Sequence, residues 1–257
     1  MKRREALCVL LLLSLPACAP PVDSVAERHA QAVKALIDLG AEVRDDEDEV
    51  SHDRGTFVFL YSEHFTREGH VEGKVLSLLS DIQSCFLGLN NTPVSDDGLP
   101  DLARLRNLQV VDFTRTRVTD RGLALLAKSR NIRLLKLNHT RITDEGLKSL
   151  ADMPSLRLLY LGDTGLSDKG LEALESLPQL EALKLTRLPV TDEGLKPLAT
   201  LPRLRYLGLG GTRLTDAGLA QFDNLPQLIH LDIQETAVSE EAASAFRQRH
   251  PKCHVER

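Results

Sequence analysis

Apolar residues of the chain recur every 24 residues between positions 84 and 251. Six successive units open with an aliphatic residue, and an earlier, degenerate unit opens with Ser84; the six are Leu108, Ile132, Leu156, Leu180, Leu204 and Leu228. The fourth and sixth positions of each unit are also apolar, as in Leu135 and Leu137. Apolar residues spaced by two lie on the same face of a strand, so each unit is expected to begin with a short strand. The fixed period predicts stacked, similar layers rather than one irregular core.

The second half of each unit has the pattern of a turn followed by a short helix. Thr occupies position nine in six of the seven units, with Leu188 as the exception, and a Thr hydroxyl can bond nearby backbone in a turn. A Thr/Ser-Asp-x-Gly-Leu segment follows, as at residues 143–147, which is typical of a capped helix start with an acid in its first turn. Proline ends four of these helices, at Pro154, Pro178, Pro202 and Pro226.

These units resemble leucine-rich repeats of the bacterial type with a Thr-Asp-x-Gly-Leu helix start. They are similar to the cysteine-containing repeats of F-box adaptor proteins, with Thr in place of that Cys. The resemblance covers residues 84–251 in seven units and implies an α/β horseshoe with a parallel concave sheet, short convex helices and protein binding. In the last unit Glu240 and Ala242 replace Asp and Gly, which suits a terminal layer that faces solvent. The register of residues 253–255, within a C-terminal stub at 252–257, stays open.

Residues 24–83 are expected to form an α/β N-terminal cap, because a bare first layer would expose the core of a solenoid. Ser24 and Glu27 have the spacing of a capping box, and Gly40 supplies a helix stop. Three further segments are expected in the cap: an acidic loop at 45–49, a strand at 56–61 and a helix at 71–82.

The first residues have the pattern of an export signal. Lys2, Arg3 and Arg4 precede an apolar run at 6–15 that is too short to span a bilayer as a helix. The run ends in Leu15-Pro16-Ala17-Cys18, which resembles a bacterial lipobox and implies a lipid on Cys18. We therefore expect a signal peptide at 1–17, a lipidated Cys18 with a tether to residue 23, and anchoring in the bacterial cell envelope, for which the outer membrane is one candidate. Ordinary secretion after signal cleavage and an uncleaved anchor are the alternatives.

Charge and cysteine content narrow the function classes. The chain has 32 Lys and Arg against 37 Asp and Glu, a formal net charge of −5, which argues against a nucleic-acid partner. Strands of one sheet lie about 4.8 Å apart, so seven layers would separate Cys85 from Cys253 by about 34 Å, whereas a disulfide needs Cα atoms within about 7 Å. These two cysteines are therefore not expected to pair.

Residues that could carry chemistry do not form a recognised catalytic or metal motif. Histidines and acids of the cap lack HExxH or paired CxxC spacing, and no serine lies in a GxSxG setting. His250, Cys253 and His254 near the C-terminus are too sparse to predict a metal site. The sequence therefore predicts no catalytic residue, no metal and no cofactor, with an enzyme site in the cap around His64 and His70 kept as the weakest alternative.

The concave face offers a candidate binding surface, because positions three and five of each unit should point away from the core. Position three reads as an apolar column, and position five as a mixed row. The predicted ligand-binding residues are Phe86, Val110, Asp112, Leu134, Lys136, Leu158, Tyr160, Lys184, Tyr206, His230 and Asp232. An exposed apolar column favours a binding site. Neighbouring side chains that cover one another, or the chain's own termini lying over the column, are the alternatives.

A basic rim beside Leu134 would steer an acidic partner or simply keep the surface soluble; it consists of Arg115, Arg117, Arg133, His139 and Arg141. The leading hypothesis is a non-enzymatic envelope lipoprotein that binds a protein ligand on its concave face and the membrane through Cys18. A structural envelope component without a discrete ligand is the second hypothesis.

Overall fold

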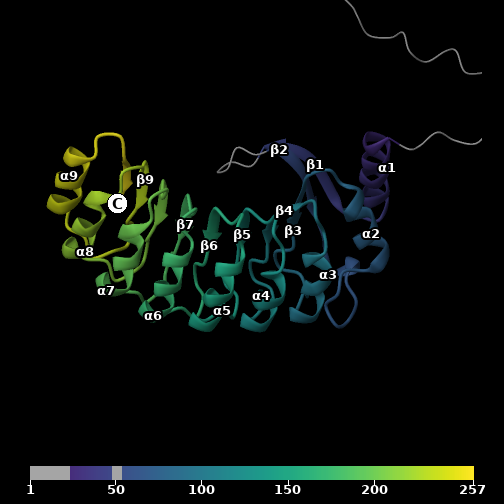
Figure 1. The fold of residues 1–257 in the computed structure, drawn as a ribbon, viewed down its shortest axis with the longest axis horizontal. Coiled ribbons are helices and arrows are strands. Elements are labelled where there is room, and N and C mark those ends of the chain that lie inside the picture. Colours follow the sequence, from purple (N-terminus) through teal and green to yellow (C-terminus); the bar gives the residue numbers. More distant parts are fainter. Residues whose placement is uncertain (1–23, 48–53) are drawn as a thin grey trace, which may run out of the picture.

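The computed structural model describes residues 24–47 and 54–257 and forms one open, curved stack (Figure 1). Ten strands form a single sheet in chain order from β1 to β10, and the helices lie along the opposite, convex side. All neighbouring strands are parallel except β1 and β2, which are antiparallel. The predicted α/β solenoid with a parallel concave sheet is confirmed.

The strands of the repeats are short, with three to five residues in each. The strands are β1 (Glu42–Glu47), β2 (Arg54–Phe59), β3 (Cys85–Gly88), β4 (Leu108–Asp112), β5 (Leu134–Lys136), β6 (Leu158–Tyr160), β7 (Ala182–Lys184), β8 (Tyr206–Gly208), β9 (His230–Asp232) and β10 (His254–Glu256).

Most helices of the repeats are a single turn that continues as a 3-10 segment. The α-helices are α1 (Val25–Asp38), α2 (Gly73–Asp81), α3 (Leu99–Ala103), α4 (Asp120–Leu126), α5 (Asp144–Lys148), α6 (Asp168–Leu171), α7 (Asp192–Leu195), α8 (Asp216–Ala220) and α9 (Glu240–Arg249). The 3-10 segments are η1 (Ser62–His64), η2 (Asp96–Gly98), η3 (Ser149–Asp152), η4 (Glu172–Ser176), η5 (Lys196–Thr200) and η6 (Gln221–Asn224).

The strand register keeps the 24-residue period to the very end of the chain. Leu134 lies beside Leu158, and His230 lies beside His254. Residues 254–256 therefore form an eighth parallel strand of the repeat type, β10, and the open register of the C-terminal stub is settled. Its core residue Val255 is buried against the last layer.

The core is filled by one set of aliphatic side chains from each layer. Positions four, six and eleven are almost fully buried, as for Leu159, Leu161 and Leu166. The position-nine threonines turn their hydroxyls inward, and each donates to the carbonyl three residues earlier in its own layer, as Thr140 does to Leu137 at 2.6 Å. Leu188 takes that place in its own layer and is buried. In the six layers that have Thr, the hydroxyl therefore supplies a hydrogen bond to a backbone carbonyl at the turn that follows the strand.

A hydrogen-bonded ladder joins each layer to the next on the helical side. The Asp of one layer accepts two hydrogen bonds from the Thr or Ser one layer on: Asp168 accepts from the backbone N–H of Thr191 at 2.8 Å and from its hydroxyl at 2.7 Å. The same pair of bonds joins Asp96 to Thr119, Asp120 to Thr143, Asp144 to Ser167, Asp192 to Thr215 and Asp216 to Ser239.

This ladder corrects the interpretation of the helix starts. Thr119, Thr143, Ser167 and Thr191 hold the N-cap position without a side-chain cap bond, and their hydroxyls donate to the preceding layer. Thr215 and Ser239 donate in the same way and also accept from a backbone N–H of their own helix, so the predicted side-chain cap is confirmed at these two starts. The glycine of the motif has the matching role. A Cβ on Gly146 would overlap the Asp120 carboxylate, and a Cβ on Gly122 would overlap that of Asp96. The motif is therefore an inter-layer device.

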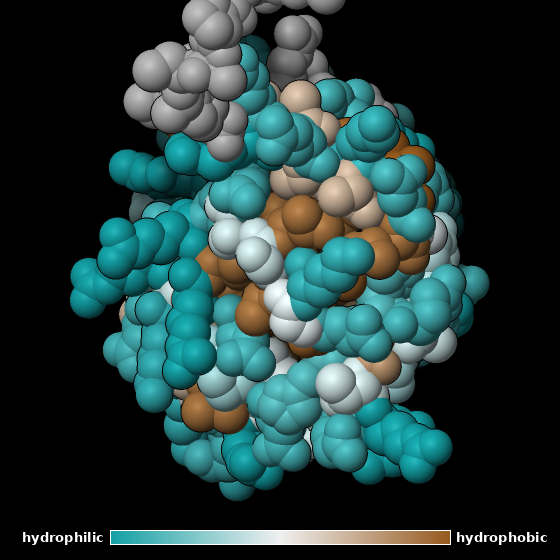
Figure 2. Space-filling view, turned by 90° about the vertical axis from the view of Figure 1, so that its right-hand side faces the viewer, coloured by the Kyte–Doolittle hydropathy of each residue, from teal (hydrophilic) through white to brown (hydrophobic). Residues whose placement is uncertain are grey.

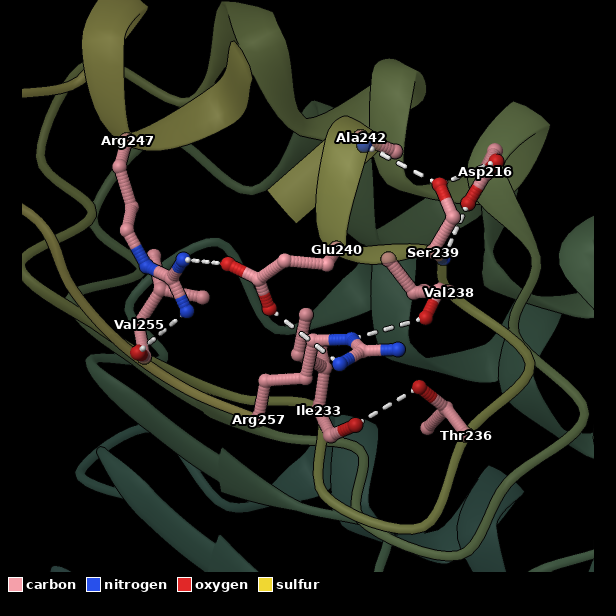
Figure 3. Close-up of polar contacts among 10 residues, drawn as sticks. All are labelled: Asp216, Ile233, Thr236, Val238, Ser239, Glu240, Ala242, Arg247, Val255 and Arg257. Carbon is pink, nitrogen blue, oxygen red and sulfur yellow. Dashed lines mark hydrogen bonds and ion pairs between the residues drawn. The ribbon is translucent and has the colours of Figure 1, made fainter. Parts of the chain in front are cut away.

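The last layer replaces the ladder with ion pairs (Figure 3). Asp216 still accepts from Ser239, whose N–H and hydroxyl lower the pKa of the Asp216 carboxyl, with Arg257 adding a smaller effect. A lowered pKa means that this stabilisation is present above the unfolded pKa and is lost as pH falls through the folded one. Glu240, which takes the place of the Asp in this layer, instead pairs with Arg247 at 2.9 Å and Arg257 at 3.2 Å.

The residue at position eight of each unit, in the turn after the strand, has the left-handed backbone conformation. Its φ is 54–60° in six layers, at Asn91, Arg115, His139, Asp163, Arg187 and Glu235, and 71° at Gly211. Gly, Asn and Asp adopt this conformation most readily, so the four residues of other types, Arg115, His139, Arg187 and Glu235, carry a conformational cost of about 1 kcal/mol each. The tight turn between strand and helix therefore overrides local preference.

The segment before the first repeat lies against it, with β2 paired to β3, and its elements have other boundaries than predicted. The Ser24–Glu27 capping box is present. The prediction of an acidic loop at 45–49 is wrong for residues 45–47, because β1 continues to Glu47 through antiparallel pairing with β2. Thr56 Oγ1 also donates to Asp45 at 2.5 Å. The strand expected at 56–61 is β2, at 54–59. The helix expected at 71–82 is α2, at 73–81, and it begins later because Val71 forms a β-bridge with Phe65.

The end of the stack formed by the cap is not uniformly polar. Figure 2 views this end and shows an apolar area among polar side chains. Helix α1 buries Ala32 and Leu36 and leaves Val25 and Ile37 exposed.

The ladder predicts non-additive mutational effects. Gly146→Ala is expected to lower the free energy of unfolding by roughly 1–3 kcal/mol because its Cβ would overpack against Asp120. Asp120→Ala is expected to cost about 1–3 kcal/mol because it removes both bonds to Thr143. The double variant should cost less than the sum, since the overlap disappears with the carboxylate. Urea denaturation measures the cycle, with Glu145→Ala as the surface control. Strictly additive costs would contradict the ladder.

Candidate binding face

The apolar column at position three lies on the concave side of the sheet and is buried. Phe86, Val110, Leu134, Leu158 and Ala182 are only 0–5% exposed and form a cluster of their own, separate from the main core. Each side chain lies beside its equivalent on the next strand, about 4.8 Å away, so neighbours remove one another from water.

An aromatic contact closes the N-terminal end of this column. Phe57 of β2 packs its ring edge-on against Phe86, with centroids 4.7 Å apart. The prediction that the column is an exposed stripe is therefore wrong for Phe86, Val110, Leu134 and Leu158. Their part in binding a ligand stays untested, but the column now has a structural role that the packing alternative describes.

Position five forms a half-exposed charged row above the column. Lys136 lies 3.9 Å from Asp112. The Tyr160 ring lies between the amines of Lys136 and Lys184, at 5.8 and 4.9 Å from its centroid, and is 6% exposed. Tyr160 is thus a support for two lysines rather than a free contact, and the prediction that it faces solvent is wrong. Lys184 is the exposed member of the row.

The C-terminal end of the concave face holds a column of rings. Tyr206 stacks on His230 with centroids 5.5 Å apart, and His230 lies 5.4 Å from His254. Tyr206, His230 and Asp232 are half-buried, as a contact surface requires. His254 and Glu256 of β10 complete this end and were not predicted. The 24-residue step from His230 to His254 is the signal that indicates the pairing.

The rim at position eight carries alternating charge rather than a purely basic stripe. Asp163 lies 3.4 Å from His139 and 3.0 Å from Arg187, and the hydrogen bonds from Arg187 to Asp163 raise the pKa of that guanidinium. Of the predicted basic rim, Arg115, Arg117 and Arg141 are exposed, whereas Arg133 and His139 are half-buried. The net basic character of this rim is therefore concentrated around layers β4 and β5.

The histidines of the cap serve the structure. His64 is buried, and its ring Nδ1 accepts from the backbone N–H of Tyr61 at 2.9 Å while Nε2 lies 3.1 Å from the Leu39 carbonyl. His70 pairs with Asp101 at 3.6 Å. Because both rings are engaged in this way, they offer no support for an enzyme site in the cap. His52 and Asp53 lie outside the described residues.

The two cysteines in the described part of the chain, Cys85 and Cys253, are buried free thiols. Burial raises the pKa of Cys85 to about 12 and that of Cys253 to about 11. The thiolate is the reactive form, so neither is suited to nucleophilic chemistry at neutral pH. The expectation that they do not pair is confirmed.

The predicted anchor, Cys18, and the signal segment also lie outside the described residues. Within the described ranges, none of the helices combines the length and apolar character that crossing a membrane requires.

Comparison with known proteins identifies the repeat and the fold. A family model described as leucine-rich repeat matches three consecutive segments, residues 104–127, 128–151 and 152–174. No curated protein matches the chain. Among solved structures, the chain is similar to an internalin from Listeria monocytogenes, with 20% sequence identity and a TM-score of 0.50 over 74% of this chain and 51% of the internalin. The chain thus carries leucine-rich repeats, folds as an open leucine-rich-repeat solenoid, and spans about half the internalin's length.

The burial of the apolar column predicts a large cost for truncating it. Leu158→Ala is expected to lower the free energy of unfolding by about 2–5 kcal/mol, because it opens a cavity in a packed cluster. Lys184→Ala, on the exposed part of the same face, should change it by less than about 0.5 kcal/mol. Chemical denaturation of both variants measures the difference, and equally small effects would show that the column is a wet surface.

Proposed function

We propose that the chain is a non-enzymatic scaffold of the bacterial cell envelope that binds a protein ligand on the exposed part of its concave face. The observation that carries the proposal is the sheet itself, which presents a continuous concave surface lined by half-exposed charged and aromatic side chains. Leucine-rich-repeat proteins commonly act as protein-binding scaffolds, and the curved surface of stacked repeats is what such proteins use for binding.

The burial pattern selects which residues would contact the ligand. The apolar column is closed by its own packing, so contacts fall to the charged row and the C-terminal rings. Lys136 and Lys184 are spaced two strands apart on either side of Tyr160, which holds both amines over its ring. Cations supported in this way lose little freedom on binding, and they favour a partner with acidic side chains.

The non-enzymatic part of the proposal is supported by the roles of the titratable groups. The repeated aspartates accept the inter-layer bonds, as Asp168 does from Thr191, and His64 holds two backbone segments of the cap. In the described part of the chain, these aspartates and His64, which are candidate catalytic acids or bases by residue type, therefore have structural roles.

The envelope part of the proposal rests on the sequence of residues 1–23. The basic start, the short apolar run and the lipobox-like Leu15-Pro16-Ala17-Cys18 support lipid anchoring at Cys18. A single anchored end would leave the solenoid free to present its concave face.

Charge reversal on the concave face tests ligand binding. Crosslinked capture from envelope extract is expected to recover a protein with the parent chain and to lose at least most of it with Lys136→Glu/Lys184→Glu, because opposite charges would then repel an acidic surface. The matched control is Lys128→Glu/Lys169→Glu, which makes the same charge change at exposed positions of the helical side. Circular dichroism verifies that each variant is folded.

Recovery of the same proteins by all three baits would overturn the concave assignment. Recovery of none by the parent would favour a structural envelope component without a discrete ligand.

Anchoring has its own test. Cys18→Ser is expected to abolish incorporation of labelled fatty acid and to move the protein from the membrane fraction to the soluble fraction, because the thiol that accepts the lipid is absent. Cys85→Ser, which changes a buried thiol of the first layer, controls for loss of a cysteine alone. Unchanged membrane association of Cys18→Ser would contradict lipid anchoring at this residue.

A further inference from the structure

Three side chains with metal-binding atoms lie together at the C-terminal end of the concave face. His230 of β9 and His254 and Glu256 of β10 offer ligand atoms that all lie within 4.8 Å of one another. The strand register produces this grouping. His254 lies directly beside His230 on the neighbouring strand, and Glu256 projects on the same face as His254 because the two are spaced by two.

The separations suit an ion rather than direct bonds. Glu256 Oε1 lies 3.6 Å from Nε2 of His230 and 3.6 Å from Nε2 of His254. These distances exceed those of N–H···O hydrogen bonds, which are about 2.7–3.2 Å. Four ligands around Zn²⁺ at about 2.0–2.2 Å would be about 3.4 Å apart in a tetrahedron, close to the distances observed.

The surroundings hold the donors in place and leave them accessible. Tyr206 stacks on His230, which lies against His254, so each ring is restrained by a neighbour. Side-chain exposure is 29% for His230, 70% for His254 and 40% for Glu256, so an ion can reach them from the concave side. Asp232 lies beside Glu256 in the register and adds negative charge nearby.

We propose that His230, His254 and Glu256 bind a divalent transition metal, with Zn²⁺ as the best fit. Two imidazoles and one carboxylate are a donor set that zinc uses when a fourth position stays open for water or another ligand. On this face, the open position points to where a protein partner would lie. The metal would also join the terminal strand β10 to β9 by bonds stronger than the strand pairing alone. The inference goes beyond the proposed function, because the ion needs no protein partner to bind.

Titration of Zn²⁺ alone into the metal-free full chain, purified without a polyhistidine tag, tests the site. Isothermal titration calorimetry is expected to show one site per chain, and the melting temperature should rise with Zn²⁺ since the ion binds the folded state. His254→Gln and Glu256→Gln should each weaken binding by more than the roughly 10–100-fold that loss of a supporting residue costs. Both residues lie on the exposed edge strand, so neither variant is expected to unfold the chain.

His139→Asn is the matched control, because it removes a half-exposed histidine of the concave rim and places Asn at a left-handed position that Asn tolerates. Co²⁺ provides an independent readout, since its visible absorption reports imidazole and carboxylate ligation in a four-coordinate site. The proposal is overturned if the parent binds no Zn²⁺ at micromolar concentration. It is equally overturned if His254→Gln and Glu256→Gln bind as the parent does, or if His139→Asn removes the site.

Discussion

The hydrogen bond from a Thr or Ser of one layer to the Asp of the layer before it is the interaction on which the rest of the solenoid depends. It fixes the distance and rotation between successive helices, and the glycine that follows keeps the space it needs. The strands on the other side are only three to five residues long and could not set this geometry alone. Because the same bonds recur six times, the position of each layer is set by the layer before it, and the sheet keeps one register from β4 to β10.

That register has opposite consequences for apolar and charged residues of the concave face. Apolar side chains placed side by side bury one another, as Leu134 and Leu158 do, and become a second core. Charged side chains placed beside an aromatic ring stay at least partly exposed and are oriented by it, as Lys136 and Lys184 are on either side of the buried Tyr160. A single structural rule thus divides one face of the sheet into a packed part and a surface that can meet a partner.

The period of 24 was sufficient to predict the layers, the parallel sheet and the core, because those depend on spacing alone. It could not reveal what the recurring Asp and Gly of each unit do, since the partner of Asp120 lies 23 residues away and the bond is tertiary. The prediction that the apolar column is exposed was wrong, because alternation along one strand shows only which face a side chain lies on. It does not show whether side chains of the neighbouring strands cover it. The grouping of His230 with Glu256 was not predicted, because Pro251 stands one residue later than the 24-residue step from Pro226 and left the register after it open. In the structure Pro251 lies in the turn before β10, and the strand returns to the period.

The position of this grouping has a consequence for how such a chain can change in length. Its members come from the last complete unit and the strand that follows, while the cap lies at the other end of the stack. Duplication or loss of whole units between them would lengthen or shorten the arc in steps of one layer, and each new junction would be closed by the same Asp and Thr. The two ends would keep their local structure and only their separation would differ. Unequal recombination within the repeats would therefore vary the reach of the concave surface while leaving both terminal structures intact.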